Sequence, residues 1–294
     1  MKTQSEKKAQ VFILLGQSNA VGHALPMKEE DKIVQPLKNV FGLHRQFNQS
    51  YDIEKLTWSG YTSAGMNLAE EDDDTYSVAN CLAANWQRRI DNGEDLPELY
   101  IVQIAIGAQG VTQGYMWNPD KEKLLKPGRL GVVDISLYSF TCHILSMIEK
   151  SFAEKGQEYE ILGLHWRGGE EETVVSMEIL ENTLQDIYHR IFSGFKNSLN
   201  REAPIVLHKL VIEECMNKND PTGERLKRMN YINGVFETLG NEWAAVKIFD
   251  PRNYPNYDGS VENNQLFKAD LVHFLAEVNE WVSEEVVKDY KAKK

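Results

Sequence analysis

Cysteine is scarce in this sequence, with three residues, Cys81, Cys142 and Cys215, among 294. They are widely spaced and include no C-x-x-C pair. This pattern argues against a disulfide framework and against a zinc site built from thiolates. We therefore interpret the cysteines as free thiols that pack in the interior.

A long apolar run and an excess of positive charge are also missing. The strongest apolar run near the start, Val11–Leu15, is far shorter than the roughly 18 residues of a membrane span. The 32 basic residues are outnumbered by 44 acidic ones, which gives a formal charge of −12. We therefore expect a soluble protein with neither a nucleic-acid nor a membrane partner. The polar first ten residues show no secretory signal, which indicates a cytoplasmic protein unless a signal was removed.

Short apolar runs alternate with longer segments of helical period along the chain. This alternation is typical of parallel strands joined by crossover helices, and it predicts an α/β fold with a doubly wound sheet. Since no linker-like shift or repeat is present, residues 1–294 are predicted to form a single domain. The predicted strands are Val11–Leu15, Leu99–Ile106, Ile161–Trp166, Pro204–Ile212 and Val246–Phe249, and the predicted helices are Tyr76–Ile90, Ile135–Glu154, Val174–Leu199, Arg225–Leu239 and Leu271–Lys288.

Two segments interrupt this alternation. Met27–Asp74 is long and weakly periodic, and its acidic run Glu70–Asp74 is typical of a solvated loop and less often of a cation site. Trp117–Gly131 is rich in proline, glycine and charge, so it is predicted to be an exposed loop. Some aromatic residues in the loops after predicted strand ends are candidates for stacking on a sugar, although most aromatic side chains belong to a core. They are Trp58, Tyr61, Tyr115 and Trp117.

The sharpest local feature is a buried strand followed at once by Gly16-Gln17-Ser18-Asn19. Ligands of open α/β sheets bind at the carboxyl ends of strands, so Ser18 lies where a reactive group is expected. A serine hydroxyl becomes a nucleophile when a neighbouring base takes its proton. The alternative is that Ser18 only caps the next helix. A phosphate loop is not indicated, because neither glycine-rich phosphate motif is present.

Two of the seven histidines have an aspartate three residues before them, in the pairs Asp186/His189 and Asp270/His273. A carboxylate beside an imidazole fixes its tautomer and stabilises the imidazolium. The first pair lies inside a predicted long helix, where this spacing is typical of an exposed face. The second lies where a loop enters the last predicted helix, near the sheet edge that carries Ser18. The alternative for Asp270 is a helix cap.

Three motifs, in their order along the chain, resemble the SGNH hydrolase superfamily. They are GQSN after the first strand, W-R-G-G-E at Trp166–Glu170 and D-x-x-H at Asp270–His273. The closest likeness is to its sialate O-acetylesterase and acetylxylan esterase-like branch, carbohydrate esterase family 6. The resemblance implies a three-layer α/β/α, flavodoxin-like fold. It also implies that Ser18 attacks an acetyl ester, that His273 acts as base and then as acid, and that Asp270 orients His273.

The resemblance further implies which groups bind the oxyanion. Gly107 would supply a backbone N–H. Relatives read W-x-Q-G-E and use the glutamine amide as a donor, but this sequence has Gly168 at that position. Losing one such donor typically costs about 10² to 10³ in turnover. The candidate replacements are Arg167, the backbone of Gly168 or Gly169, Gln109 and Asn19.

Several polar residues beside these motifs have other expected roles. Gln17 is a further candidate for binding the oxyanion or the substrate. Glu170 matches the glutamate of the family motif, and we interpret it as a support of the loop. Glu171 and Glu172 are predicted to be a charged entry to a helix, since acidic residues favour the first turn.

The sequence thus predicts a serine esterase, without metal or cofactor, that removes O-acetyl groups from a carbohydrate through an acyl-enzyme intermediate. Its substrate would be a small-molecule or polysaccharide acetyl ester of acetylxylan or sialic-acid type. The alternative, motivated by Gly168, is a catalytically weakened carbohydrate-binding protein on the same fold. A glycosidase using Glu170 and Glu172 would need two acids about 5 to 9.5 Å apart across a sugar cleft, and nothing in the sequence places them so.

Overall fold

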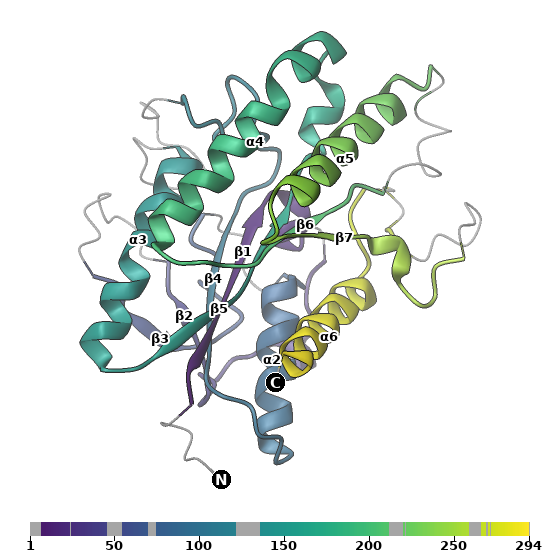
Figure 1. Ribbon diagram of the computed structural model, residues 1–294. Coiled ribbons are helices and arrows are strands. Elements are labelled where there is room, and N and C mark those ends of the chain that lie inside the picture. The colour runs from purple at the N-terminus through teal and green to yellow at the C-terminus, as the bar shows by residue number, and fades with distance from the viewer. Residues whose placement is uncertain are drawn as a thin grey trace.

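A seven-stranded sheet forms the centre of the described part of the chain (Figure 1). The computed structural model describes residues 7–23, 25–45, 55–69, 75–121, 136–211, 220, 222–258, 266–268, 270 and 272–293. The acidic run Glu70–Asp74 and Cys215 lie outside these residues. The strands are β1 (Ala9–Gly16), β2 (Val40–Leu43), β3 (Trp58–Gly60), β4 (Leu99–Ala105), β5 (Tyr159–Arg167), β6 (Ile205–His208) and β7 (Val246–Phe249).

The strand order, β3-β2-β4-β1-β5-β6-β7, determines where a ligand would bind. Every neighbouring pair is parallel except β2 and β3. Without that pair the order is β4-β1-β5-β6-β7, which is the flavodoxin-like order, and the direction of winding reverses between β1 and β5. All eight residues of β1 are buried, as expected of a strand covered on both faces. The predicted doubly wound sheet is confirmed, and its switch point is the carboxyl end of β1 and β5.

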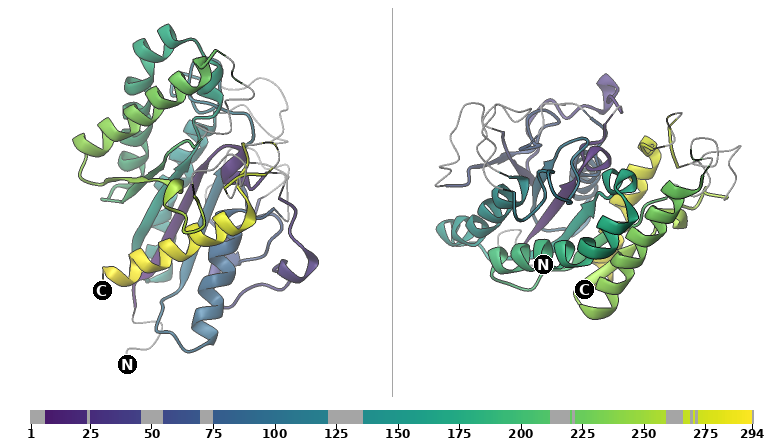
Figure 2. Two further views of the ribbon diagram at one scale, coloured as in Figure 1. Left: turned by 90° about the vertical axis from the view of Figure 1, so that its right-hand side faces the viewer. Right: turned by 90° about the horizontal axis from the view of Figure 1, so that it is seen from above.

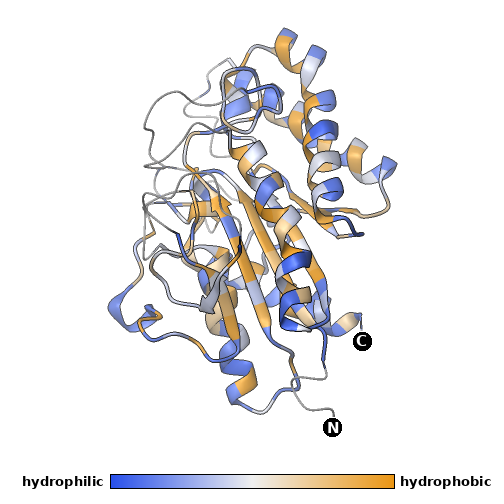
Figure 3. Cartoon of the chain, turned by 90° about the vertical axis from the view of Figure 1, so that its left-hand side faces the viewer, coloured by the Kyte–Doolittle hydropathy of each residue, from blue (hydrophilic) through white to orange (hydrophobic). Residues whose placement is uncertain are grey.

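Helices cover both faces of the sheet, as the two views of Figure 2 show. Side chains of α3, α4 and α5 pack on one face, and those of α2 and α6 pack on the other. Figure 3 shows hydrophobic colours along the strands and mixed colours on the helices, which is typical of helices with one buried side. No helix of the described residues is long and apolar enough to cross a membrane. The helices are α1 (Ser18–Val21), α2 (Val78–Asp91), α3 (Leu137–Lys155), α4 (Met177–Leu199), α5 (Glu224–Glu242) and α6 (Ala276–Ala292), with 3₁₀ turns η2 (Glu29–Asp31), η3 (Glu171–Val174) and η5 (Pro251–Asn253).

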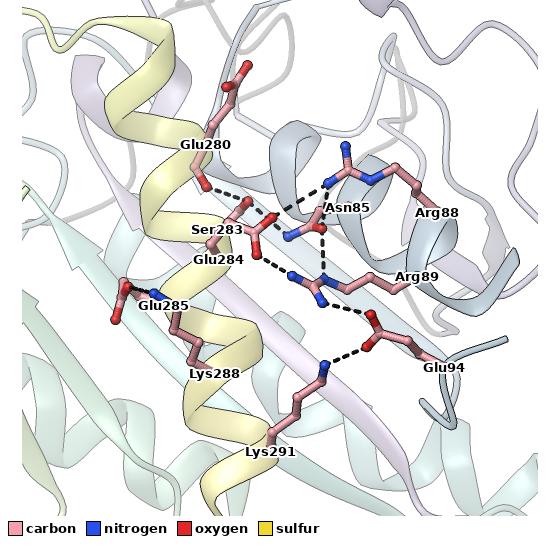
Figure 4. Close-up of polar contacts among 10 residues, drawn as sticks. All are labelled: Asn85, Arg88, Arg89, Glu94, Glu280, Ser283, Glu284, Glu285, Lys288 and Lys291. Carbon is pink, nitrogen blue, oxygen red and sulfur yellow. Dashed lines mark hydrogen bonds and ion pairs between the residues drawn. The ribbon is translucent and has the colours of Figure 1, made fainter. Parts of the chain in front are cut away.

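A polar network fixes α6 on α2 (Figure 4). Arg89 of α2 pairs with Glu284 of α6 and, at 2.8 Å, with Glu94 after α2. Lys291 near the end of α6 also pairs with Glu94. Each exposed pair contributes little alone, but a network along two packed helices restrains their register. Since the segment with His273 leads directly into α6, this contact also restrains the position of His273.

Two of the predicted loops contain structure that the sequence did not indicate. Within Met27–Asp74, β2 and β3 extend the sheet beyond β4. These strands have four and three residues, too few to give a period-2 pattern. The prediction of an exposed loop is wrong for Trp117, which is fully buried. Its indole N–H donates to the carbonyl of Gly16 at 3.2 Å, and its ring packs against Trp166.

The bounds of some predicted elements also differ from the observed ones. β6 ends at His208, before the predicted end at Ile212. Val174 lies in η3, and α4 begins three residues later because Ser176 caps it by accepting the N–H of Ile179. The last helix begins at Ala276, not at Leu271.

Candidate active site

The turn after β1 holds Ser18 at the switch point of the sheet. β1 ends at Gly16, where φ is +140°, and a Cβ there would lie 1.9 Å from the carbonyl oxygen of Arg167. Only glycine allows this approach. The same carbonyl accepts the N–H of Gln17 at 2.9 Å. Gln17 occupies the N-cap position of α1, so Ser18 is the first helical residue and not the cap, and it is half-buried.

Asp270 and His273 form the predicted carboxylate–imidazole pair. Nδ1 of His273 lies 2.9 Å from Oδ2 of Asp270. Oδ1 of Asp270 accepts the N–H groups of Val272 at 2.9 Å and of His273 at 3.0 Å. Burial raises the pKa of Asp270, but these hydrogen bonds outweigh it and leave the pKa below its usual range. Asp270 thus orders the turn before α6 instead of capping that helix, and Nε2 of His273 remains available as the basic nitrogen.

The side chain of Asn19 connects the Ser18 turn to the His273 segment. Its Nδ2 donates to the carbonyl of Val272 at 3.1 Å. Its Oδ1 accepts the N–H of Phe274 at 3.2 Å. The residue after Ser18 therefore binds the residues on both sides of His273, although 254 positions separate Asn19 from His273 in the chain. In the described residues Ser18 itself makes no side-chain hydrogen bond to His273, and such bonds in enzymes often tighten only with substrate.

Glu170 binds the two amides that flank Ser18. Nδ2 of Asn19 donates to Oε1 of Glu170 at 2.6 Å, and Nε2 of Gln17 donates to Oε2. Both hydrogens of the Asn19 amide are therefore used, one by Glu170 and one by Val272. Glu170 supports the Ser18 turn in this arrangement, since its two oxygens face that turn.

Arg167 lies beneath the same turn and is almost fully buried. Its Nη1 donates to the carbonyl of Asn19 at 3.0 Å and to Oδ1 of Asn279 in α6 at 2.7 Å. The guanidinium also lies over the ring of Phe274, 4.8 Å from the centroid. Burial lowers the pKa of Arg167 to about 10, opposed by the charge of Glu170. This side chain thus joins β5, the Ser18 turn and α6, a role that nothing in the sequence indicates apart from its place in the W-R-G-G-E motif.

The loop after β4 lies beside the Ser18 turn. The N–H of Ile106 donates to the carbonyl of Gly16 at 3.3 Å, and buried Gly107 follows directly. Ala108 has a φ of +56°, which is unusual for a residue with a Cβ. The side-chain oxygen of Gln109 accepts the N–H of Met116 at 3.2 Å, so its amide nitrogen retains donor capacity.

The position of the missing glutamine is open to a side chain. A Cβ on Gly168 would lie 3.4 Å from ring atoms of Trp166, an ordinary contact at its lower limit. Gly168 does not have a positive φ, whereas Gly169 has a φ of +132°. A Cβ is therefore accommodated at Gly168, and glycine is needed at Gly169.

The remaining sequence candidates lie apart from this group. His189 is on the surface of α4, where its Nε2 is 2.7 Å from Glu242, and its neighbour Asp186 faces Arg190. Tyr61 is fully buried and donates to Asn80, so it cannot stack on a sugar. Among the described residues no three His, Cys, Asp or Glu side chains are arranged to hold a metal ion.

Comparisons with known proteins connect this geometry to solved structures. No protein-family model and no curated protein sequence matches the chain. NanS matches with a TM-score of 0.63 at 16% identity, over 97% of this chain and 98% of NanS. A protein from Arabidopsis thaliana matches with a TM-score of 0.58 at 16% identity, over 96% of this chain and 98% of that protein. The chain has an SGNH hydrolase-like fold. A carbohydrate acetylesterase from Xanthomonas citri matches with a TM-score of 0.51 at 10% identity, over 95% of this chain and 55% of the esterase.

The expected three-layer α/β/α architecture is thereby confirmed. In this SGNH hydrolase-like fold, Ser18, Gly107 and Gly168 all follow strands that end at one edge of the sheet, those strands being β1, β4 and β5. The Asp270/His273 pair reaches that edge from the segment before α6. The fold therefore gathers the residues of all three sequence motifs at one place.

Proposed function

We propose that this protein is a serine esterase that removes O-acetyl groups from a carbohydrate, of acetylxylan or sialic-acid type, through an acyl-enzyme intermediate. The observation that carries the proposal is the Asn19 bridge, because it fixes the Ser18 turn to both neighbours of His273. The Asp270–His273 hydrogen bond supplies the orientation that a general base requires. The fold likeness to a carbohydrate acetylesterase from Xanthomonas citri supports the substrate class.

The proposed reaction has two halves. Nε2 of His273 takes the proton of Ser18 as Oγ attacks the acetyl carbonyl, and the resulting imidazolium gives that proton to the departing sugar oxygen. Water then attacks the acetyl-serine with His273 again as base, which releases acetate and restores Ser18. Asp270 stays ionised throughout and stabilises the imidazolium. The loops at Gly107 and Gly168 face the developing oxyanion.

The test is hydrolysis of 4-nitrophenyl acetate and of acetylated xylose and sialic acid. We expect acetate release by the wild type and a loss of about 10³-fold or more in kcat for Ser18→Ala and for His273→Ala. Ser139→Ala, a hydroxyl in the first turn of α3, is the matched control and should keep full activity. A wild-type rate equal to that of Ser18→Ala would contradict the proposal.

A carbohydrate-binding protein on the same fold is the second candidate, and Gly168 favours it because a side-chain oxyanion donor is missing there. Binding of an acetylated sugar without any turnover would support it. The glycosidase alternative loses support, because Glu170 is engaged by Gln17 and Asn19 and Glu172 is completely buried.

A further inference from the structure

Glu171 and Glu172 lie in the first turn of η3, as the predicted charged helix entry requires, but the Glu172 carboxylate is buried. It lies in η3, two residues after Glu170, and its relative exposure is 0%. Burial raises the pKa of Glu172 to about 7, although backbone N–H groups that donate to it act in the opposite direction. An acid with such a pKa is partly ionised at neutral pH, and the proposed reaction does not use it.

The contacts of Glu172 run to the loop that contains Gly107. Its Oε1 accepts the N–H of Val111 at 2.6 Å and that of Thr112 at 3.4 Å. A Cβ on Gly110 would lie 2.1 Å from the same oxygen, so the loop backbone rests directly on the carboxylate. Glu172 therefore ties the loop after β4 to the segment after β5, the two segments that contain the candidate oxyanion donors.

The second carboxylate oxygen of Glu172, Oε2, is the atom that carries the proton when the side chain is neutral. Oε2 of Glu172 is buried and has no hydrogen-bond partner in the described part of the chain, and the same holds for the hydroxyl of Tyr188. Burial raises the pKa of Tyr188, and the charge of Glu172 adds to this effect, so the two groups are neighbours. A protonated Glu172 keeps Oε1 toward Val111 and carries its proton on Oε2.

Among the described residues no cationic side chain forms an ion pair with Glu172. Glu170 on the same segment raises its pKa. Tyr115 of the Gly107 loop and Tyr188 of α4 both respond to its charge. From α5, Arg225 and Arg228 both donate to Thr173 and not to Glu172. The backbone N–H groups of Val111 and Thr112 are thus its stabilising partners when it is ionised.

We propose that Glu172 is a positioning residue whose ionised carboxylate holds residues 107–112 in the conformation that stabilises the oxyanion, so that turnover by the Ser18–His273 pair is several-fold faster when Glu172 is ionised. This inference rests on the proposed esterase function. A hydrogen bond to a charged acceptor is roughly twice as strong as one to a neutral acceptor. Protonation of Glu172 therefore weakens the contact to Val111 and relaxes the loop.

Stability should change with pH in the opposite direction to turnover. The folded-state pKa of Glu172 is raised from 4.5 to about 7, so its contribution to stability is complete below pH 4.5 and is lost as the pH rises through 7. Glu172→Gln keeps a neutral acceptor for Val111 and has no such loss. The variant should therefore be at least as stable as the wild type above about pH 8, yet slower.

The experiment compares wild type, Glu172→Gln and Glu171→Gln in kcat, KM and Tm across pH. Dividing the wild-type kcat by that of Glu172→Gln cancels the shared titration of the catalytic base. We expect this ratio to rise from near 1 below about pH 6 to about 5- to 10-fold above pH 8, with KM changed less than about twofold. Glu171→Gln alters the adjacent half-buried carboxylate and is the control. The wild-type kcat divided by that of Glu171→Gln should stay near 1 at every pH.

A ratio that does not change with pH would overturn the proposal, and so would a Glu172→Gln variant that loses stability and turnover together. The amide resonances of Val111 and Thr112 in Ser18→Ala protein give a readout without catalysis. They should titrate near pH 7 and stop doing so when Glu172→Gln is added. If the wild type has no esterase activity while these resonances titrate as expected, the proposed function fails and the contact of Glu172 with the loop stands.

Discussion

Placing glutamine at position 168 should accelerate the proposed esterase reaction. Gly168 has no positive φ, and its new Cβ would make an ordinary contact of 3.4 Å with the ring of Trp166. Gly168→Gln therefore fits without backbone strain, and removing a glycine from an ordinary conformation stabilises the fold by about 0.4 to 1 kcal/mol. If the amide reaches the oxyanion, it supplies a donor worth about 2.7 to 4 kcal/mol, or about 10²- to 10³-fold in kcat.

The assay is the kcat and KM of wild type, Gly168→Gln and Gly168→Ala with 4-nitrophenyl acetate and with an acetylated sugar. Gly168→Ala adds the same Cβ without an amide, so it separates packing from hydrogen bonding. We expect the kcat of Gly168→Gln to exceed that of Gly168→Ala by at least about tenfold, with KM nearly unchanged. A folded Gly168→Gln protein no faster than Gly168→Ala would refute it, and would show that another group already supplies the donor.

Four other changes test the supports of the site. Arg167→Lys should reduce kcat by about tenfold or more, because the shorter lysine side chain misplaces the donor to Asn19 and α6 and its ammonium has no planar face to stack on Phe274. Asn19→Ala should lower kcat by about 10²-fold through misplacement of His273 and reduce the free energy of unfolding in urea by about 2 to 3 kcal/mol. Gly16→Ala should lower the free energy of unfolding by more than about 3 kcal/mol, because the new Cβ collides with the Arg167 backbone. Acid should destabilise the fold through His165, whose pKa burial lowers from 6.5 to about 3, so stability present above pH 6.5 is lost as the pH falls toward 3.

Each of these expectations has an outcome that contradicts it. Wild-type kcat in Arg167→Lys would show that the guanidinium does not position the Ser18 turn. Unchanged kcat in Asn19→Ala would remove the bridge as the link between Ser18 and His273. A Gly16→Ala protein with wild-type Tm would contradict the close approach of β1 to β5. For His165, a constant Tm from pH 7 to pH 4 in Glu172→Gln protein, which lacks the opposing change from Glu172, would contradict the burial of a neutral imidazole.

The sequence predicted the central strands and long helices because their apolar periods are long and unambiguous. It also predicted the Asp270/His273 pair, since both residues belong to one short motif and the side chains need only a local turn to meet. The short strands β2 and β3 escaped prediction because they lie in a long, weakly periodic segment, whereas β7, which also has four residues, directly follows a long helix.

The supports of the site escaped prediction for a different reason. Arg167 and Glu172 are charged, and a charged residue in a sequence is normally assigned to the surface. Each is buried beside a hydrogen-bond partner that is distant in the chain, the Asn19 carbonyl for Arg167 and the Val111 N–H for Glu172. Such tertiary hydrogen bonds leave no local pattern, so only the folded arrangement reveals them.

The most direct test of the proposed mechanism is to identify the side chain that reacts. The protein is treated with a serine-directed organophosphonate, digested and mapped by mass spectrometry, in wild type, Ser18→Ala and His273→Ala. The proposed mechanism predicts a single modified peptide carrying the label on Ser18, no label in Ser18→Ala, and labelling slowed by about 10²-fold or more in His273→Ala. A label on another residue, or an equal labelling rate without His273, would contradict it.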